Sequence, residues 1–198
     1  MEANSTFILV ISDSHGGTAN LAAVLEWAQS GICAYAFDAA VFLGDGFADL
    51  SPVSARTGFP LSWHAVRGNG DYESTVHDNK VLEIPGKNPA QRSSRRLFLS
   101  HGHRYRVEEG VSSIAAAARG AGAEAALFGH IHVPYRANVD GIFLLNPGSI
   151  SRPRNNAGCT FAVLECPDSG PLAARFFNMT DQRCREIKLG GENKPDSG

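Results

Sequence analysis

Short apolar runs recur along the chain, each the length of a strand and too continuous for a strand with one exposed face. We expect buried strands at Phe7–Ser12, Ala39–Leu43, Trp63–Val66, Arg96–Ser100 and Ala125–Phe128. The spacing of apolar positions between them predicts a helix at Leu21–Gln29, with Asn20 as its N-cap, and another at Val111–Arg119. We also expect a short helical stretch after Leu43. This alternation favours an α/β fold in which helices cover a mostly parallel sheet.

The pattern changes in the last third of the chain. Strand-like segments separated by turn residues follow at Gly141–Ser149, Cys159–Cys166 and Ala173–Thr180, and they predict an antiparallel continuation. We find no internal repeat and no segment that reads as a linker. The sequence therefore predicts one domain over residues 1–198, with a disordered tail at 190–198.

Composition excludes several classes of protein. The 198 residues are 43% hydrophobic and 19% charged with a net charge of −2, which is ordinary for a globular protein and argues against a stable nucleic-acid complex. No apolar stretch approaches the roughly 18 residues that cross a bilayer, and the first residues lack the basic start of a signal peptide, so we expect a cytoplasmic protein without a membrane partner. The four cysteines form no C-x-x-C pair, which disfavours a zinc-thiolate site.

Polar residues follow each of the five expected strands of the first part. In chain order they are Asp13 and His15 in "DSH", Asp45 in "GD", Asn69 and Asp71 in "RGNGD", His101 and His103 in "HGH", and His130 and His132 in "GHIH". Each motif alone is common in ordinary turns. Their occurrence in order is informative, because the carboxyl ends of parallel strands lie along one edge, where ligands bind. The i, i+2 spacing within "DSH" and "GHIH" predicts extended segments whose side chains point the same way.

These side chains form a ligand set of nitrogen and oxygen atoms without thiolate. The set comprises Asp13, His15, Asp45, Asn69, His101, His130 and His132. It exceeds one tetrahedral site and suits two divalent transition-metal ions; we expect Mn²⁺ first, with Fe²⁺, Ni²⁺ or Zn²⁺ as alternatives. Asp45 is the natural bridge between the ions, because it lies in the middle of the ligand set and is alone at the end of its strand. A bridging carboxylate would hold the ions about 3.5–4 Å apart.

Two metal ions at that separation are typical of sites that hydrolyse phosphoesters. They would share a water and lower its pKa enough to supply hydroxide near neutral pH. Their charge would also stabilise the phosphoryl oxygens in the transition state. We therefore expect hydrolysis of a phosphoester by in-line attack of a metal-bridging hydroxide.

The motifs in this order resemble those of the calcineurin-like metallophosphoesterase superfamily. The boxes "VRGNGD", "SHGHRYRV" and "LNPGSISRPR" are similar to its small prokaryotic YfcE-like phosphodiesterase branch, and the resemblance runs from Phe7 to Arg154. It implies a four-layer sandwich of two mixed β-sheets flanked by helices. It also implies a phosphodiesterase that acts on a small phosphoester or nucleotide-like substrate.

The resemblance further implies a role for each ligand. The first metal would take Asp13, His15, Asp45 and His132, and the second Asp45, Asn69, His101 and His130. Asp45, Asn69 and His103 would be catalytic, while Asn69, His103 and Arg104 would contact substrate. The loop Asn146–Ser149 would pack under the site.

One position departs from the family pattern. Many members have a histidine directly after the "GN" asparagine, where this chain has Gly70. The leaving group would then take its proton from His103 or from a metal-bound water. Asp71 is either an orienter of a ligand or a plain turn residue.

Alternative functions remain open at this stage. A retromer subunit with the same fold works as a scaffold, so a metal-binding but non-catalytic interaction protein is the main alternative. A dinuclear hydrolase of amides or lactones is the second. The sequence also leaves open the natural substrate, the preference for diester or monoester, and the oligomeric state, a homo-oligomer included.

Overall fold

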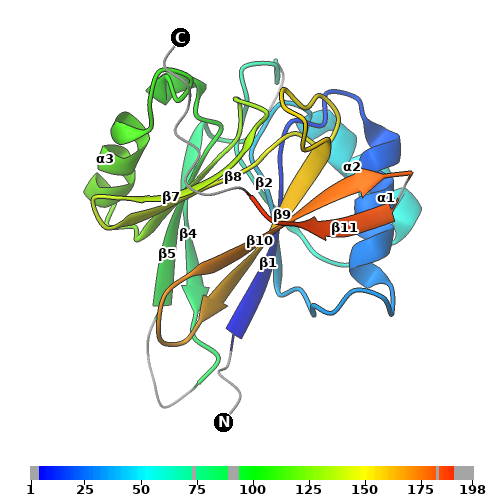
Figure 1. The fold of residues 1–198 in the computed structure, drawn as a ribbon, viewed down its shortest axis with the longest axis horizontal. Coiled ribbons are helices and arrows are strands. Elements are labelled where there is room, and N and C mark those ends of the chain that lie inside the picture. Colours follow the sequence, from blue (N-terminus) through cyan, green and yellow to red (C-terminus); the bar gives the residue numbers. More distant parts are fainter. Residues whose placement is uncertain (1–4, 73–74, 89–93, 182, 190–198) are drawn as a thin grey trace.

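The computed structural model describes residues 5–72, 75–88, 94–181 and 183–189. Two β-sheets pack face to face, with helices on the outer face of each (Figure 1). Helices α1 (Thr18–Gln29) and α2 (Phe47–Thr57) cover one sheet, and α3 (Ser112–Gly120) covers the other. This arrangement confirms the sandwich of two mixed sheets that the family resemblance implies. The expected tail at 190–198 lies outside the described residues.

The first sheet has the strand order β11-β10-β9-β1-β2-β3. Its strands are β1 (Ser5–Ile11), β2 (Ala39–Phe42), β3 (Trp63–Ala65), β9 (Cys159–Pro167), β10 (Ala173–Thr180) and β11 (Arg183–Ile187). Strands β1, β2 and β3 are parallel, with Val10 opposite Val41, whereas β9, β10 and β11 continue the sheet antiparallel. The antiparallel continuation expected for Cys159–Cys166 and Ala173–Thr180 is therefore present.

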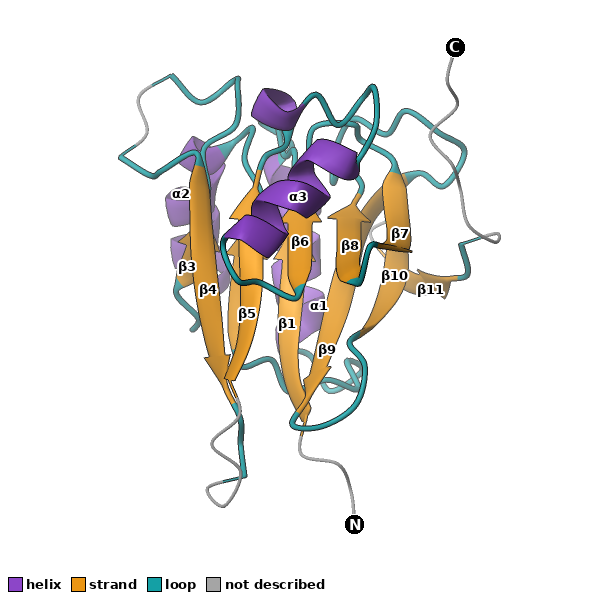
Figure 2. Ribbon diagram, turned by 90° about the vertical axis from the view of Figure 1, so that its left-hand side faces the viewer, coloured by secondary structure: helices purple, strands orange, loops and turns teal. Residues whose placement is uncertain are grey.

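The second sheet has the order β4-β5-β6-β8-β7. Its strands are β4 (Asn79–Pro85), β5 (Ser94–Ser100), β6 (Ala125–Phe128), β7 (Pro134–Val139) and β8 (Ile142–Pro147). Strands β5, β6 and β8 are parallel, and β4 and β7 lie antiparallel at the two edges. A short 3-10 helix, η1 (His103–Tyr105), follows β5. In Figure 2 the parallel strands of both sheets end at the upper side of the molecule, so their following loops gather there.

The apolar runs are continuous because both faces of the central strands are covered. Ile8 and Val10 of β1 pack between the sheets against β5 and β6, whereas Leu9 and Ile11 pack under α1 and α2. Helix α3 forms a third cluster on the outer face of the second sheet. A strand buried on both sides has no polar face, which explains the missing alternation.

Three expectations drawn from the residue pattern are wrong in detail. The five strands do not form one mostly parallel sheet but divide between two, because burial on both faces does not reveal which sheet a strand joins. The segment Gly141–Ser149 yields β8, which is antiparallel to β7 but parallel to β6, and it does not belong to the sheet that β9 and β10 continue. Asn20 does not cap α1: Gly17 occupies the N-cap, and the Asn20 amide donates to the carbonyl of Ile150 at 2.9 Å.

The pattern also missed three edge strands, β4, β7 and β11, whose exposed polar residues interrupt the apolar runs. The short helical stretch expected after Leu43 is the full helix α2. Within the described parts of the chain, no helix is long and apolar enough to span a bilayer.

Candidate metal centre

The loops after β1, β2, β3, β5 and β6 meet at one end of the sandwich. The N–H of Asp13 donates to the carbonyl of Gly44 at 3.0 Å within the first sheet, and the N–H of Gly129 donates to the carbonyl of His101 at 3.0 Å within the second. Between the sheets, the N–H of His130 donates to Oδ2 of Asp13 at 3.1 Å. The ligand-bearing turns are therefore fixed to one another by hydrogen bonds.

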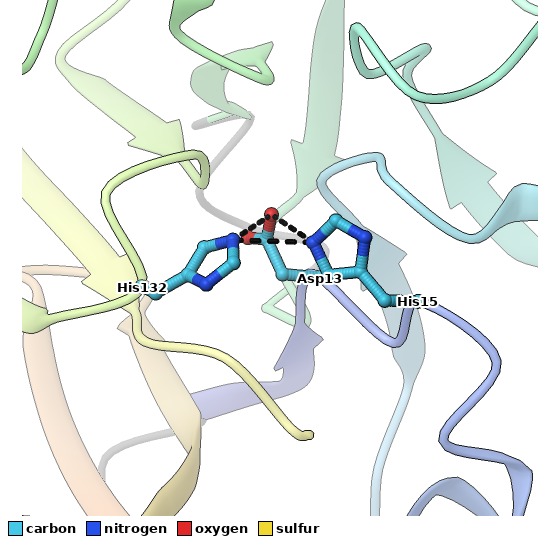
Figure 3. A group of neighbouring side chains, drawn as sticks. All are labelled: Asp13, His15 and His132. Atoms are coloured by element: carbon cyan, nitrogen blue, oxygen red, sulfur yellow. Dashed lines mark hydrogen bonds and ion pairs between the residues drawn. The ribbon is translucent and has the colours of Figure 1, made fainter. Parts of the chain in front are cut away.

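Asp13, His15 and His132 form the first group of potential ligands (Figure 3). Nε2 of His132 lies 3.1 Å and Nε2 of His15 3.7 Å from Oδ1 of Asp13, and the two imidazole nitrogens are 3.2 Å apart. Asp13 is fully buried and His132 nearly so, whereas His15 is partly exposed. Three donor atoms within 4.8 Å of one another are close enough to bind one metal ion together.

Asp13, Asp45 and His101 form the second group. Nε2 of His101 lies 3.6 Å from Oδ2 of Asp45 and 4.0 Å from Oδ1 of Asp13. Nε2 of His101 is also 3.2 Å from Oδ1 of Asn69, so the predicted asparagine faces the same space. This second group adjoins the first, because both contain Asp13.

Asp45 is placed more evenly between the two groups than Asp13. Oδ2 of Asp45 lies 3.7 Å from Nε2 of His15 and 3.6 Å from Nε2 of His101. Oδ1 of Asp13 is closer to His132, at 3.1 Å, than to His101, at 4.0 Å. The expected bridging role of Asp45 is compatible with these distances, although Asp13 is the residue that the two groups share.

His130 is the one predicted histidine ligand that joins neither group. Its Nε2 lies 3.5 Å from Oε2 of Glu108, and its ring centroid is 5.2 Å from that of His101. The ring thus borders the second group. Its role as a ligand stays a prediction.

Backbone conformation at the ligand turns differs from the expected extended segments. Positive φ angles occur at Asp13 (56°), His15 (42°), Asp45 (59°), His130 (71°) and His132 (58°). Residues other than glycine seldom adopt this left-handed region, and such strain concentrates at functional sites. The i, i+2 pairs therefore converge because the chain turns sharply, and the expectation of extended segments is wrong.

Hydrogen bonds orient the ligand side chains. Nδ1 of His101 is bonded to the carbonyl of Leu43 at 2.6 Å, and Nδ1 of His132 to the carbonyl of Arg152 at 2.7 Å. A carbonyl accepts only from N–H, so in both rings the proton is on Nδ1 and the lone pair of Nε2 faces the site. This is the usual outer support of a metal-ligating histidine.

Asp71 orients the ligand residue Asp45 and is not a plain turn residue. Its carboxylate accepts the backbone N–H groups of Asp45, Gly46, Phe47 and Gly68, each at 2.9 Å. Burial raises the pKa of Asp71, but these four donors outweigh it and hold the pKa below its usual value. Asp71 is thus an anion that fixes the turn carrying Asp45.

The loop expected under the site lies there. Asn146 is fully buried, and its amide donates to the carbonyl of Gly129 at 2.6 Å. The hydroxyl of Ser149 donates to the carbonyl of Asp13 at 2.8 Å. The loop therefore supports the turns of both Asp13 and His130.

The charge state of Asp13 favours a cation. Burial alone raises its pKa, but contacts with His132 and His15 and the charge of His101 hold the pKa well below its usual range. Contact with the Asp13 carboxylate in turn raises the pKa of His15. Oδ1 of Asp13 is buried and accepts no hydrogen bond from the described residues. A buried carboxylate oxygen that faces imidazole lone pairs fits a divalent metal ion, which would satisfy all of them at once.

The predicted substrate contacts lie beside the second group. The ring centroid of His103 is 5.4 Å from that of His101, and its Nδ1 is buried without a hydrogen-bond partner among the described residues. Burial and the charges of His101 and His130 lower the pKa of His103. Arg104 is half-exposed and binds Oδ2 of Asp78 at 2.8 Å.

Sequence reasoning missed two acidic neighbours of the site. Asp78 bonds both Arg67, with 2.8 Å from Nε to Oδ1, and Arg104. Glu108 faces His130. Neither residue stands in a motif or at the end of a strand, so no local signal could have singled them out.

Comparison with known proteins points to one family. A protein-family model, described as the calcineurin-like phosphoesterase superfamily domain, matches residues 7–169 of the sequence. Phosphodiesterase YfcE of Escherichia coli (strain K12) is 29% identical over 174 residues, which cover 80% of this chain and 86% of that protein. The family match includes every turn that carries a predicted ligand.

Solved structures share the fold. A conserved protein of Streptococcus pneumoniae TIGR4, described as a predicted phosphoesterase, matches with a TM-score of 0.69 at 26% identity and covers 92% of this chain and 97% of its own. Wild-type Vps29 of Entamoeba histolytica, complexed with Zn²⁺, matches with a TM-score of 0.65 at 20% identity and covers 92% and 98% of the two chains. The second likeness shows the fold alone.

Proposed function

Because this chain belongs to the calcineurin-like phosphoesterase superfamily, we propose that it is a phosphodiesterase that works with two divalent metal ions. The observation that carries the proposal is the pair of adjoining ligand groups, Asp13–His15–His132 and Asp13–Asp45–His101. Oδ2 of Asp45 lies within 3.7 Å of a histidine from each group. Two such groups side by side suit the two-metal chemistry of phosphoester hydrolysis.

The proposed ligands divide as the family resemblance implies. Asp13, His15, Asp45 and His132 would hold the first ion, and Asp45, Asn69, His101 and His130 the second. Imidazole, carboxylate and amide donors suit Mn²⁺, Fe²⁺, Ni²⁺ or Zn²⁺, and we propose Mn²⁺. The Zn²⁺ bound to Vps29 supports the capacity of this fold for such ions. When bound, the ions supply a nucleophilic water near neutral pH and neutralise charge on the phosphoryl group.

Side chains beside the second group would bind and orient the substrate. Oδ1 of Asn69 and the lone pair of Nε2 of His101 are two acceptors 3.2 Å apart, which suits a cation held between them, and the NH₂ group of Asn69 can donate to a phosphoryl oxygen. Since the pKa of His103 is lowered, its ring is mainly neutral at pH 7 and can donate one hydrogen bond to the same group. Arg104 carries a guanidinium at the rim, where it can pair with phosphate oxygens.

Gly70 restricts the choice of leaving group. No side chain follows Asn69 to protonate the departing oxygen, and a Cβ atom at Gly70 would lie 3.1 Å from Oδ1 of Asp45, so the turn is closely packed. His103 can donate a proton only from its protonated form, whose population at pH 7 is small. We therefore expect faster cleavage of diesters with good leaving groups. The name of the relative YfcE, phosphodiesterase, supports the preference for diesters.

A comparison of substrate classes tests this proposal. Chelator-treated protein is titrated with Mn²⁺, Ni²⁺, Zn²⁺ and Mg²⁺ and assayed with bis-p-nitrophenyl phosphate, p-nitrophenyl phosphate, a p-nitroanilide and a lactone. We expect turnover only with a transition metal and fastest on the diester. Faster turnover of the anilide or the lactone would favour the second class of dinuclear hydrolase.

A metal-binding scaffold is the alternative function, favoured by the likeness to Vps29. In that case the folded protein would bind two ions and hydrolyse none of the phosphoesters. The retention of a donor atom at all seven ligand positions favours the enzyme, because a scaffold could lose individual donors without losing its interaction surface.

A further inference from the structure

Arg152 is fixed to the metal centre through its backbone. Its N–H donates to Oγ of Ser149 at 2.8 Å, and its carbonyl accepts the Nδ1–H of His132 at 2.7 Å. Ser149 is itself bonded to the carbonyl of Asp13. The backbone of Arg152 is thus bonded directly to the ring of His132 and, through Ser149, to the turn of Asp13.

The side chain of Arg152 makes no polar contact that would stabilise the described part of the fold. It is exposed, and its guanidinium makes no hydrogen bond or ion pair with the residues that the structure describes. Its main chain lies against the ring of His132, whose Nδ1 is bonded to the Arg152 carbonyl at 2.7 Å. Asp49 lies against the turn that carries His15, but its carboxylate accepts hydrogen bonds from the hydroxyl of Ser14 at 2.6 Å and the N–H of Gly16 at 2.9 Å. Arg152 therefore presents a positive charge, with no ion-pair partner among the described residues, from a backbone position bonded to the ring of His132.

The arginine on the other side of the site is different. Arg104 and Arg67 both form ion pairs with Asp78. Arg104 can approach an anion only in competition with Asp78. Arg152 has no such competitor among the described residues.

We propose that Arg152 binds a second phosphate group of the substrate, so that the preferred class is phosphodiesters that carry a further terminal phosphate. This inference rests on the proposed function. The scissile diester has one negative charge and would sit over the buried groups of Asp13, Asp45 and His101, where two ions supply ample positive charge. An exposed guanidinium at the rim is placed for an anionic group farther along the molecule, and its planar donors match phosphate.

A matched pair of substrates tests the proposal. The p-nitrophenyl ester of thymidine 5′-phosphate is compared with the same ester bearing an additional 3′-phosphate, both with Mn²⁺-loaded protein. We expect KM to be about tenfold or more lower for the 3′-phosphorylated ester, the size of one hydrogen bond to a charged group. The variant Arg152→Met should lose this preference, and Arg152→Lys should keep part of it. Arg183→Met, which removes an exposed arginine on β11, should keep all of it.

A binding measurement separates this proposal from the proposed function. Thymidine 3′,5′-bisphosphate and thymidine 5′-phosphate are titrated calorimetrically into Mn²⁺-loaded wild type and Arg152→Met. We expect tighter binding of the bisphosphate by wild type only. Equal affinities in wild type, or a preference that survives in Arg152→Met, would overturn the role of Arg152. Absence of hydrolysis of both esters would overturn the proposed function instead, and the calorimetric difference would still decide the role of Arg152.

Discussion

The carboxylate of Asp71 accepts the backbone N–H of Asp45, with 2.9 Å between Oδ2 and N. The same carboxylate holds the N–H groups of Gly46, Phe47 and Gly68. A residue outside the proposed ligand set therefore determines the position of the central ligand. Among the described residues, the carboxylate of Asp71 bonds only backbone N–H groups.

Replacement of Asp71 by asparagine should weaken metal binding by about 10- to 100-fold, the range for outer supports of metal ligands. Asparagine has one acceptor oxygen, and its NH₂ group would face N–H donors. Calorimetric titration with Mn²⁺ measures the change. Asp140→Asn is the matched control, because Asp140 is exposed and its one ion pair among the described residues is with Arg119 at the surface. Equal affinities of Asp71→Asn and Asp140→Asn would contradict the positioning role.

The stability of the wild type relative to Asp71→Asn should also depend on pH. The pKa of Asp71 is lowered in the folded protein, so its carboxylate stabilises the fold above the ordinary pKa of aspartate, and this stabilisation is lost as pH falls through the lowered pKa. The difference in free energy of unfolding between wild type and Asp71→Asn should be largest at pH 7 and shrink toward pH 3. Denaturant titrations in the presence of chelator measure it. A difference that does not change with pH would mean that the charge of Asp71 is not what holds the turn.

Two glycine substitutions should have opposite effects. A Cβ atom at Gly68 would lie 2.1 Å from Oδ1 and 2.3 Å from the backbone nitrogen of Asp45, whereas at Gly120 in α3 it would meet nothing within 4 Å. Gly68→Ala should destabilise the protein by about 1–3 kcal/mol and impair metal binding. Gly120→Ala should stabilise it by up to about 1 kcal/mol, since alanine is the better helix former. Urea unfolding distinguishes them, and a Gly68→Ala protein as stable as wild type would contradict the close approach of the two turns.

Removal of the His103 ring should affect esters according to their leaving group. If protonated His103 supplies the proton, His103→Ala should slow phenyl esters by about 10²-fold or more and p-nitrophenyl esters much less. Since the pKa of His103 is lowered, the protonated ring becomes more abundant as pH falls, and the ratio between wild type and variant on phenyl esters should grow in that direction. Rate profiles between pH 5 and 8 measure this ratio. An equal loss on both esters at every pH would assign His103 to binding the phosphoryl group.

The strand ends were predictable from the sequence because they combine two local signals. An apolar run such as Ala125–Phe128 followed at once by Gly129 and two histidines marks both a buried strand and a change in chemistry. The order of the motifs supplied the family, which the matching family model confirms. No comparable signal shows that Asp13 belongs to both ligand groups, because that depends on how two sheets face each other.

Other features depend on tertiary contacts that leave no local trace. Strand β4 pairs with β5 at an edge where polar residues such as Lys80 and Glu83 are tolerated, so its pattern was not that of a strand. The left-handed conformation of His15 and His132 is imposed by the surrounding hydrogen bonds, since neither residue type demands it. The contact of Glu108 with His130 likewise joins two loops.

Anomalous diffraction from crystals grown with Mn²⁺ tests the central claim most directly. We predict two peaks about 3.5–4 Å apart, one beside Nε2 of His132 and one beside Nε2 of His101, with Asp45 between them. Crystals of His132→Ala should lose or weaken the first peak and serve as the internal control. A single peak, or none at saturating Mn²⁺ in crystals of the wild-type protein, would contradict the dinuclear centre.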